Sequence, residues 1–465
     1  MTQIKPAVTA SSTGKWKAYP AYKDSGVEWL GEIPVRWDVR RLKYLTKDMI
    51  AGPFGSSLTK DLYTTEGYRV YGQEQVIPAD FSIGDYYIPE DLFLTMTRYA
   101  VNAGDVLVSC VGTFGKVAVV PLEVEPGIIN PRLVKLVPNK DVILPAYLGL
   151  LLRSQVAFEQ IEQVSRGGTM GVINLGLLSD LLLSLPSLDE QRTIATYLDC
   201  ETARINALIA KKEQLIELLQ EKRSALISHA VTKGLDPTVP MKDSGIDWLG
   251  EIPTHWEVRR MKFAASFFGG GTPSKENLEY WSGDIPWVSP KDMKTEIIHD
   301  AEDHITKEAI ENSSTRLVQP GAVLIVVRSG ILKHSIPVAI NVRAVALNQD
   351  MKAIVPQNFL KPEYLASVIR GHQSALLVEW RKEGATVESI EYELLVNTLC
   401  PIPPLSEQHD IVDYLKSETA KIDALITRIG EGIEKLKEYN SALISAAVTG
   451  KIDVMETIGN QAEHL

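Results

Sequence analysis

The stretch from Leu185 to Asp236 reads LPSLDEQRTIATYLDCETARINALIAKKEQLIELLQEKRSALISHAVTKGLD, and it decides the fold of this chain. Asp189 is typical of a helix start, since its carboxylate accepts hydrogen bonds from the free N–H groups of the first turn. The apolar residues that follow alternate in steps of four and three, the spacing of a coiled-coil seam. The seam residues are Leu198, Ile205, Ile209, Ile216, Leu219 and Leu226, interrupted at Lys212 and Arg223. A helix is therefore predicted from about Asp189 to the stop at Gly234.

The same segment occurs a second time, without a gap, from Ile402 to Asp453, at an offset of 217 residues (402 minus 185). Its seam residues are Leu415, Ile422, Ile426, Ile433, Leu436 and Leu443. Each helix spans about 40 residues and so roughly 60 Å, at ~1.5 Å per residue. A stripe this long and narrow is not buried by one helix alone. Two unrelated core helices would not be an ungapped duplicate of each other, so we expect the two copies to pair.

An opening motif is duplicated as well, from Tyr22 to Leu45 and again from Met241 to Phe263. The chain is therefore a tandem duplication of an opener, a globular stretch and a long helix. The predicted parts are a polar tail (1–20), a first domain (21–184), a central helix (185–236), a second domain (237–401), a distal helix (402–450) and a tail (451–465). Paired tryptophans flank a Gly-Glu-Ile-Pro turn in each opener, and we expect them to pack it onto its domain.

The globular stretches alternate short β-type runs with turns. Strands are predicted at 105–109, 117–120, 322–327 and 338–340, and helices at Ala146–Gln163 and Pro362–Glu379, each opened by a proline. This order favours an α+β fold with two globular domains, each with a twisted and mainly antiparallel sheet. The two stretches share the order but little residue identity, which suggests one scaffold with two different binding surfaces.

Composition fits a globular protein of two or three domains, with 465 residues, 45% apolar and 23% charged. No run of eighteen apolar residues and no apolar signal core occur, so we expect a cytoplasmic protein. The three cysteines have neither metal-ligand nor disulfide spacing. The net charge of −11 requires either local basic patches or partner subunits to contact nucleic acid.

Catalytic motifs are largely missing. Phe267-Phe268-Gly269-Gly270-Gly271 has the F-x-G-x-G spacing of a methyl-donor site, but the (N/D)-P-P-(Y/F) loop that should accompany it is absent. Gly112 to Lys116 is too short for a Walker A loop, and no H-E-x-x-H or nucleophile elbow occurs. We therefore expect no catalysis, no metal and no cofactor on this chain.

The loops of both domains do carry groups suited to a polynucleotide. Glycines let the backbone approach phosphates, and Gln, Asn, Arg and Ser side chains reach base edges. The first-domain candidates are Gly52, Ser56, Ser57, Lys60, Tyr71, Gln73, Gln75, Lys116, Arg166 and Thr169. The second-domain candidates are Gly270, Gly271, Thr272, Ser274, Lys275, Trp287, Ser289, Lys291, Arg328, Lys333, Arg381 and Thr386.

Two further features leave alternatives open. The basic groups Arg40-Arg41-x-Lys43 and Arg259-Arg260-x-Lys262 either form a solvated edge or contact phosphates. The matched loops at 166–170 and 383–387 either face DNA or simply end the preceding helix.

Taken together, the arrangement resembles the specificity subunit of Type I restriction–modification enzymes over nearly the whole chain. The resemblance rests on the two W-L-G-x-I-P-x-x-W-x-x-x-R openers, Gly-Gly-Thr-Pro-Ser at 270–274, the two P-x-L-x-E-Q helix starts and the two S-A-L-I-S helix ends. It implies two target-recognition domains separated by an antiparallel helix pair, each reading half of a gapped double-stranded DNA site. It also implies two modification subunits that methylate adenine, restriction subunits, and S-adenosylmethionine, ATP and Mg on those partners.

Two rival hypotheses stay open from the sequence. The chain could belong to a related gapped-site system whose partner fuses methylation and cleavage, or it could be a coiled-coil scaffold that binds no nucleic acid.

Overall fold

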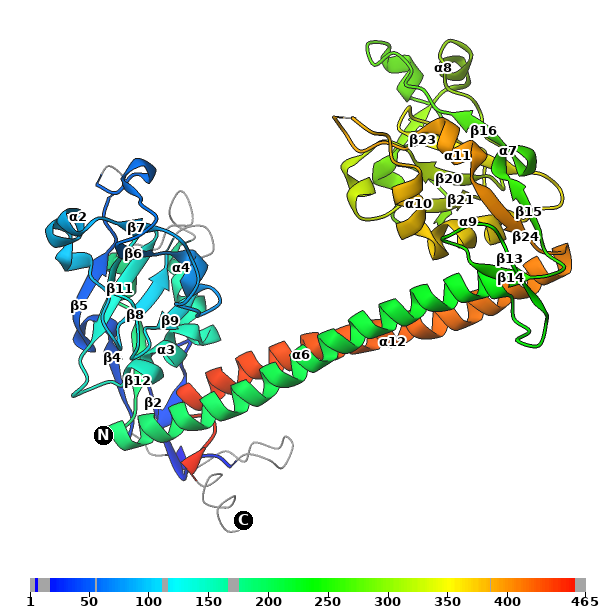
Figure 1. The fold of residues 1–465 in the computed structure, drawn as a ribbon. Coiled ribbons are helices and arrows are strands. Elements are labelled where there is room, and N and C mark those ends of the chain that lie inside the picture. Colours follow the sequence, from blue (N-terminus) through cyan, green and yellow to red (C-terminus); the bar gives the residue numbers. More distant parts are fainter. Residues whose placement is uncertain are drawn as a thin grey trace. The chain divides into compact units, whose positions relative to one another are not determined.

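The computed structural model describes residues 5–6, 17–54, 57–110, 116–165, 175–384 and 386–455 (Figure 1). The chain divides into two compact units, one formed by residues 1–211 with 431–465 and the other by 212–430. Each unit contains a globular domain together with a segment of each long helix, α6 (Leu188–Lys233) and α12 (Leu405–Val448). The predicted boundaries separate the helices from the domains, whereas the compact units group each domain with the helix segments against which it packs.

The two predicted long helices are confirmed, and they run antiparallel. Thr202 Oγ1 donates to Asn440 Oδ1 at 3.2 Å in the first unit. Arg223 Nε donates to Asp423 Oδ1 at 3.0 Å in the second. A residue later in α6 thus contacts a residue earlier in α12. Every predicted seam residue is covered: Leu198, Ile205, Leu415, Ile422, Ile433 and Leu443 are buried, and Ile209, Ile216, Leu219, Leu226, Ile426 and Leu436 are half-buried.

The first domain is built on an antiparallel sheet in the order β5-β11-β8-β9. Its strands are β5 (Thr46–Ala51), β11 (Leu133–Pro138), β8 (Val106–Ser109) and β9 (Val117–Val119). A smaller sheet contains β10 (Gly127–Ile129), β6 (Tyr68–Tyr71) and β7 (Tyr87–Ile88), with α1 (Gln73–Val76) and α2 (Glu90–Thr95) nearby in sequence.

The second domain repeats this plan with the order β16-β23-β20-β21-β18. Its strands are β16 (Ala265–Gly269), β23 (Met351–Pro356), β20 (Val323–Val326), β21 (Val338–Asn341) and β18 (Ile297–Ile298), the last parallel to β21. Its smaller sheet contains β19 (Asp303–Ile305), β17 (Ile285–Val288) and β22 (Ala346–Leu347). The predicted α+β class with mainly antiparallel sheets is confirmed.

The inner strands β8 and β20 are buried on both faces, which explains their continuous apolar runs. Successive side chains of a strand point to opposite faces. Val323 and Ile325 accordingly join the core beside the long helices, and Leu324 and Val326 join a separate core on the other face. The helices α3 (Pro145–Arg153) and α9 (Pro362–Gly371) supply the helical side of each domain core.

Each predicted short helix is two helices in the structure. α3 ends at Arg153 and α4 (Gln155–Ser165) begins at Gln155, because Ser154 has extended backbone angles and its hydroxyl accepts from the N–H of Ala157. This is the geometry of a helix N-cap, which interrupts the run. In the second domain His372 separates α9 from α10 (Gln373–Glu379).

The P-x-L-x-E-Q helix starts fix each opener to its domain with the same bonds. Trp37 Nε1 donates to Glu190 Oε1 at 3.0 Å, and Trp256 Nε1 donates to Glu407 Oε2 at 2.9 Å. Both indoles are buried, as the sequence predicts. Gln191 and Gln408, the next residues, are buried as well. The amide of Gln191 bonds the loop before α3 to the start of α6, and the amide of Gln408 bonds the loop before α9 to the start of α12.

Further short strands pair either within an opener or between an opener and the entry to its long helix. They are β2 (Ala21–Asp24), β3 (Glu32–Pro34), β4 (Asp38–Arg41) and β12 (Leu182–Leu185) in the first unit, and β13 (Met241–Asp243), β14 (Glu251–Pro253), β15 (Glu257–Arg260) and β24 (Leu399–Ile402) in the second. The first-unit domain packs on the end of α12, because Tyr147 Oη donates to Val448 O at 3.3 Å and Tyr22 Oη donates to Gly450 O at 3.0 Å. In the second unit Tyr364 Oη donates to Val231 O, at the end of α6, at 3.1 Å.

Candidate DNA interface

Antiparallel pairing gathers the candidate loops at one edge of each central sheet. In the first domain β5 and β8 end where β9 and β11 begin. We call this the first loop edge, and it comprises Gly52, Gln73, Ser109, Lys116 and residues 130–132. In the second domain β16 and β20 end where β21 and β23 begin. We call this the second loop edge, and it comprises residues 270–272, 328–333, 348–350, 381–384 and 386–390.

The first loop edge is held together around the end of β8. Gln73 Nε2 donates to Ser109 Oγ at 2.6 Å, and the N–H of Ser109 donates to Lys116 O at 2.9 Å. Ser109 is fully buried, whereas Lys116 is exposed. The structure thus brings together the predicted residues Gln73 and Lys116.

The second loop edge is linked by side-chain bonds. Arg328 Nε donates to Asp350 Oδ1 at 2.6 Å, and Gln349 Nε2 donates to the other oxygen of that carboxylate at 3.5 Å. The hydroxyl of Thr272 donates to Gln349 Oε1. These bonds connect the loop after β16 with the loops beside β20 and β23.

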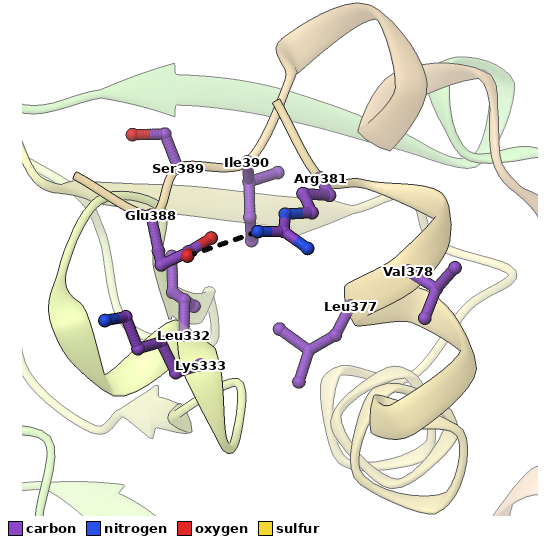
Figure 2. A pocket seen from close by; sticks show the side chains of 8 residues that line it. All are labelled: Leu332, Lys333, Leu377, Val378, Arg381, Glu388, Ser389 and Ile390. Atoms are coloured by element: carbon purple, nitrogen blue, oxygen red, sulfur yellow. Dashed lines mark hydrogen bonds and ion pairs between the residues drawn. The ribbon is translucent and has the colours of Figure 1, made fainter. Parts of the chain in front are cut away.

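A cleft of about 280 Å³ opens at this edge between η6 (Gly330–Lys333) and α10 (Figure 2). Its apolar lining is Leu332, Leu377, Val378 and Ile390, and its polar lining is Lys333, Arg381, Glu388 and Ser389. Figure 2 shows Leu377 facing Leu332 across the cleft, with Arg381 directed at Glu388. Five predicted polar residues, Thr272, Arg328, Lys333, Arg381 and Thr386, therefore lie at one loop edge.

Sequence reasoning missed Gln349, Asp350 and Glu388. A signal for the first two was present, because Asn130 and Asn348 each begin a turn in front of the matching strand. Asn130 Oδ1 accepts from the N–H two residues on at 2.9 Å, and Asn348 Oδ1 does so at 3.0 Å. The repeat of this Asx turn marks the same loop in both domains.

Four candidate side chains are buried and bonded inside their domain, so they are not placed to contact a ligand at the surface. Tyr71 is fully buried and its hydroxyl donates to Glu125 O at 2.8 Å. Gln75 is 1% exposed and its amide nitrogen donates to Ile83 O. Trp287 Nε1 donates to Gly271 O at 2.9 Å, and Ser289 Oγ donates to Asp292 Oδ2 at 2.8 Å. Tyr71 and Trp287 lie on strands of the smaller sheets, Gln75 lies in α1, and Ser289 follows β17.

Three predicted glycines lie in close contact with a neighbouring loop of their own domain. A side chain at Gly52 would overlap the carbonyl of Asn130, one at Gly270 would overlap the carbonyl of Asn348, and one at Gly271 would overlap Ser314. These glycines let neighbouring loops of the same domain pack closely. Their approach to a phosphate stays a prediction.

The other candidates stay predictions. Ser57, Ser274, Lys275 and Thr386 are exposed, and the ammonium of Lys291 is paired with Asp303 at 2.9 Å and Glu302 at 3.3 Å. Ser56, Arg166 and Thr169 lie outside the described residues, as does the side chain of Lys60.

The basic groups of the openers make matching internal contacts. Arg41 and Lys43 both donate to Asp180 Oδ1, at 2.9 and 3.1 Å, and the hydrogen bond from Lys43 lowers the pKa of that carboxyl. Arg260 and Lys262 both donate to Asn397 Oδ1, at 3.1 and 2.7 Å. Of the two alternatives, these contacts favour a basic edge of the fold over a phosphate contact.

The first three residues of the F-x-G-x-G segment lie on β16, which pairs antiparallel with β23. A methyl-donor loop would instead follow a strand of a parallel sheet, so the surroundings do not fit one. Among the described residues, no group of three or more His, Cys, Asp and Glu side chains could hold a metal ion. Burial raises the pKa of the Cys110 and Cys400 thiols to about 12, which suits small apolar side chains. Within the described part of the chain, no helix is both long and apolar enough to cross a membrane.

Comparison with known proteins places this architecture in a family. The model of the Type I restriction modification DNA specificity domain matches residues 56–218 and 253–435, which is most of the chain. The chain therefore belongs to the Type I restriction–modification DNA specificity family, with two copies of its domain. Its function is DNA sequence recognition in such a system, and two copies fit a bipartite site.

Individual relatives agree with this assignment. The chain is 37% identical to the Escherichia coli EcoR124I/EcoR124II specificity subunit over 203 residues, 43% of this chain and 46% of the relative. It is 28% identical to the putative MjaX specificity subunit of Methanocaldococcus jannaschii, over 91% of this chain and 96% of the relative. The fold is also that of the HsdS subunit from Thermoanaerobacter tengcongensis, with a TM-score of 0.50 at 19% identity over 90% of this chain and 98% of the other.

Proposed function

We propose that each domain reads one half of a gapped double-stranded DNA site through its loop edge. One observation carries this proposal. The ends of β8 and β20 are matched places in the duplicated scaffold, but the polar side chains near them differ between the two halves. Gln73 and Lys116 lie at the first loop edge, and Arg328, Lys333 and Arg381 lie at the second. A common frame with different side chains at one edge suits two independent half-sites.

An exchange of domains tests this proposal. Residues 264–401 are replaced by the matching segment of a related chain, and the methylated motif is read from the genomic DNA of cells that carry the hybrid. One half of the motif should change and the other should stay as in the parent. A hybrid that changes both halves would show that the domains do not read independently.

We further propose that the long helices bind two modification subunits. Leu208 is 45% exposed and Leu425 is 48% exposed, although both lie on helices whose seam is covered. They occupy matched positions of the duplication, 217 residues apart, so each unit presents an equivalent apolar site. In the first unit Leu208 lines a cleft of about 510 Å³ with Ile205 and Tyr439. Two equivalent sites suit two copies of the same partner, with restriction subunits joining that complex.

The chain itself is proposed to be catalytically silent, with S-adenosylmethionine, ATP and Mg bound by its partners. The antiparallel surroundings of Phe267-Phe268-Gly269-Gly270-Gly271 support this. Purified alone with methyl donor and duplex DNA, the chain should transfer no methyl groups. Methyl transfer that disappears in the Gly269→Ala, Gly271→Ala double variant would contradict the proposal. Because it acts on cellular DNA, we propose a cytoplasmic location.

A partner that fuses methylation and cleavage remains the second candidate. Co-purification from the native cell separates the two, since separate modification and restriction polypeptides would differ in mass from one fused polypeptide. A coiled-coil scaffold without DNA is disfavoured by the family match.

A further inference from the structure

Arg381, at the second loop edge, has a fixed backbone and an exposed side chain. Arg381 follows Trp380, which is fully buried and donates from Nε1 to Thr398 Oγ1 at 2.6 Å. The backbone then forms a hairpin, since Arg381 bridges to Ile390 and the N–H of Lys382 donates to Ser389 O at 2.9 Å. The base of the hairpin is bound to the end of β20, because the N–H of Ile390 donates to Val327 O at 2.8 Å.

The side chain of Arg381 is 65% exposed, and its Nη2 contacts Glu388 Oε1 at 3.4 Å. Glu388 is itself fixed, because its carbonyl accepts from the N–H of Ser329 at 3.1 Å and its side chain is 23% exposed. A guanidinium has five N–H donors in a planar fork. One long contact to a carboxylate orients such a group without binding it tightly.

Two other arginines of this domain are held more firmly. Arg370 Nη1 donates to Glu296 at 2.8 Å and its Nη2 donates to Val338 O at 3.0 Å, with the side chain 20% exposed. Arg328 contacts Asp350 at 2.6 Å. Arg381 is therefore the better placed of the three to exchange its contact for one with a ligand.

The surroundings of Arg381 suit a base edge more than a phosphate alone. Leu377, Leu332 and the 80% exposed Val378 give the cleft an apolar wall, and Lys333 adds an exposed cation. In the major groove, arginine donates two parallel hydrogen bonds to O6 and N7 of guanine, and apolar side chains contact the thymine methyl group. Lysine contacts phosphate as a point charge.

We propose that Arg381 is a base-reading residue of the second domain, that it recognises a guanine in the major groove, and that Glu388 positions its guanidinium while Lys333 contacts a phosphate. This inference rests on the proposed function, because it requires the second loop edge to meet DNA. In the complex, the fork of Arg381 turns from Glu388 to the guanine, and the apolar wall lies along the neighbouring base pairs.

The test uses the full chain with its modification subunits and compares Arg381→Ala, Arg381→Lys and Lys333→Ala with the parent. The readouts are the methylated motif in cells and binding to duplexes that vary at each position of the site. Arg381→Ala should relax one G·C position in the half that residues 264–401 specify, and should weaken binding to the parental site by roughly 5- to 100-fold. Arg381→Lys should also lose discrimination there, because lysine lacks the fork. Lys333→Ala should weaken binding to all sequences alike and reduce the dependence of log affinity on log salt by about one.

A matched control is Arg343→Ala, in the same domain, with a side chain that is 47% exposed and lies 3.7 Å from Asp300. It should leave the motif unchanged. If Arg381→Ala weakens binding equally at all positions, or changes nothing, the base-reading role is wrong. If exchange of residues 264–401 leaves the motif unaltered, the proposed function of the domain fails as well, so the two failures are distinguishable.

Discussion

At the scale of single residues, Glu190 connects the N-terminal segment of the first unit to α6. Its carboxylate accepts from Trp37 Nε1 at 3.0 Å and from the hydroxyl of Tyr19 at 2.8 Å. Both donors belong to the segment that packs on the start of α6. Burial raises the pKa of Tyr19 far above its usual value, and the bond to Glu190 adds to this.

Replacing Glu190 with Ala should therefore destabilise the first unit. The buried Trp37 N–H would lose its acceptor, and an unpaired buried donor costs about 1–3 kcal/mol. Urea unfolding followed by tryptophan fluorescence measures the change. Glu213→Ala, at an exposed position of the same helix, is the control and should shift the midpoint little. Equal shifts for both variants would mean that the Trp37 bond contributes nothing.

His372 makes the second unit sensitive to acid. Burial lowers the pKa of His372 from 6.5 to about 4, and its Nε2 lies 2.9 Å from the hydroxyl of Thr232. Between these pH values the unfolded chain takes up a proton that the folded chain excludes. The stability that His372 contributes is thus fully present above pH 6.5 and is lost as the pH falls towards 4.

We expect His372→Gln to reduce this loss, since Gln155 occupies the matched position of the first domain. The measurement is the thermal unfolding midpoint at pH 7.5 and at pH 5.0. His409→Gln, at a 59% exposed position, is the control. A His372→Gln variant that loses as much stability as the parent between the two pH values would contradict a buried neutral imidazole.

At the scale of elements, α12 presents two kinds of apolar residue. Ile422 is 6% exposed in the seam, and Leu425, three residues on, is 48% exposed. The first contributes to the helix pair, and the second is available to a partner. Burial in the helix pair and exposure to a partner thus depend on where a residue lies around the helix.

Substitutions at the two positions should have opposite effects. Ile422→Ala removes buried methylene groups and should cost about 2–4 kcal/mol of stability. Leu425→Asp should leave the unfolding midpoint nearly unchanged but weaken association with the modification subunits. Unfolding of the isolated chain and gel filtration with partners measure the two effects. Normal complex formation by Leu425→Asp would place the partner surface elsewhere.

The sequence predicts elements better than contacts, and the reason is physical. Seam positions such as Leu198 and Ile422 repeat at fixed intervals, so their burial follows from spacing alone. Tyr71 and Trp287 have no such period. Their burial depends on which strands pair, and that is set by contacts between residues far apart in sequence. Glu388 was missed because nothing local indicates that it lies beside Arg381.

At the scale of the whole molecule, the continuous helices α6 and α12 join the two units. Their lengths should therefore set the gap between the half-sites. Four residues inserted between Ala210 and Lys211 lengthen α6 by ~6 Å, close to two base pairs at ~3.4 Å each. Such an insert adds nearly one full turn, so the seam keeps its register if α12 bulges or slides.

The expected result is a methylated motif with the same two halves and a longer gap, or loss of activity if the strain is not absorbed. Motif analysis of cells that carry the insertion gives the answer. Full activity with the parental gap would show that the helices do not determine the spacing.

The net charge of −11 describes the whole chain. It does not show which cations are available at the loop edges. Lys116 and Lys333 are exposed, whereas Arg328 is paired with an acidic side chain. Local composition thus reveals which cations exist, but their availability depends on the folded contacts.

The packing of the first unit on the end of α12 has a consequence for how the protein is made. Leu443, Ile444, Ala447, Val448 and Val454 belong to the same core as Trp37 and Tyr147. The second unit, by contrast, is one unbroken segment, residues 212–430. When only residues 1–430 have emerged from the ribosome, the second unit is therefore complete. The first unit still lacks part of its core. Although it is synthesised first, the amino-terminal domain must complete its folding last.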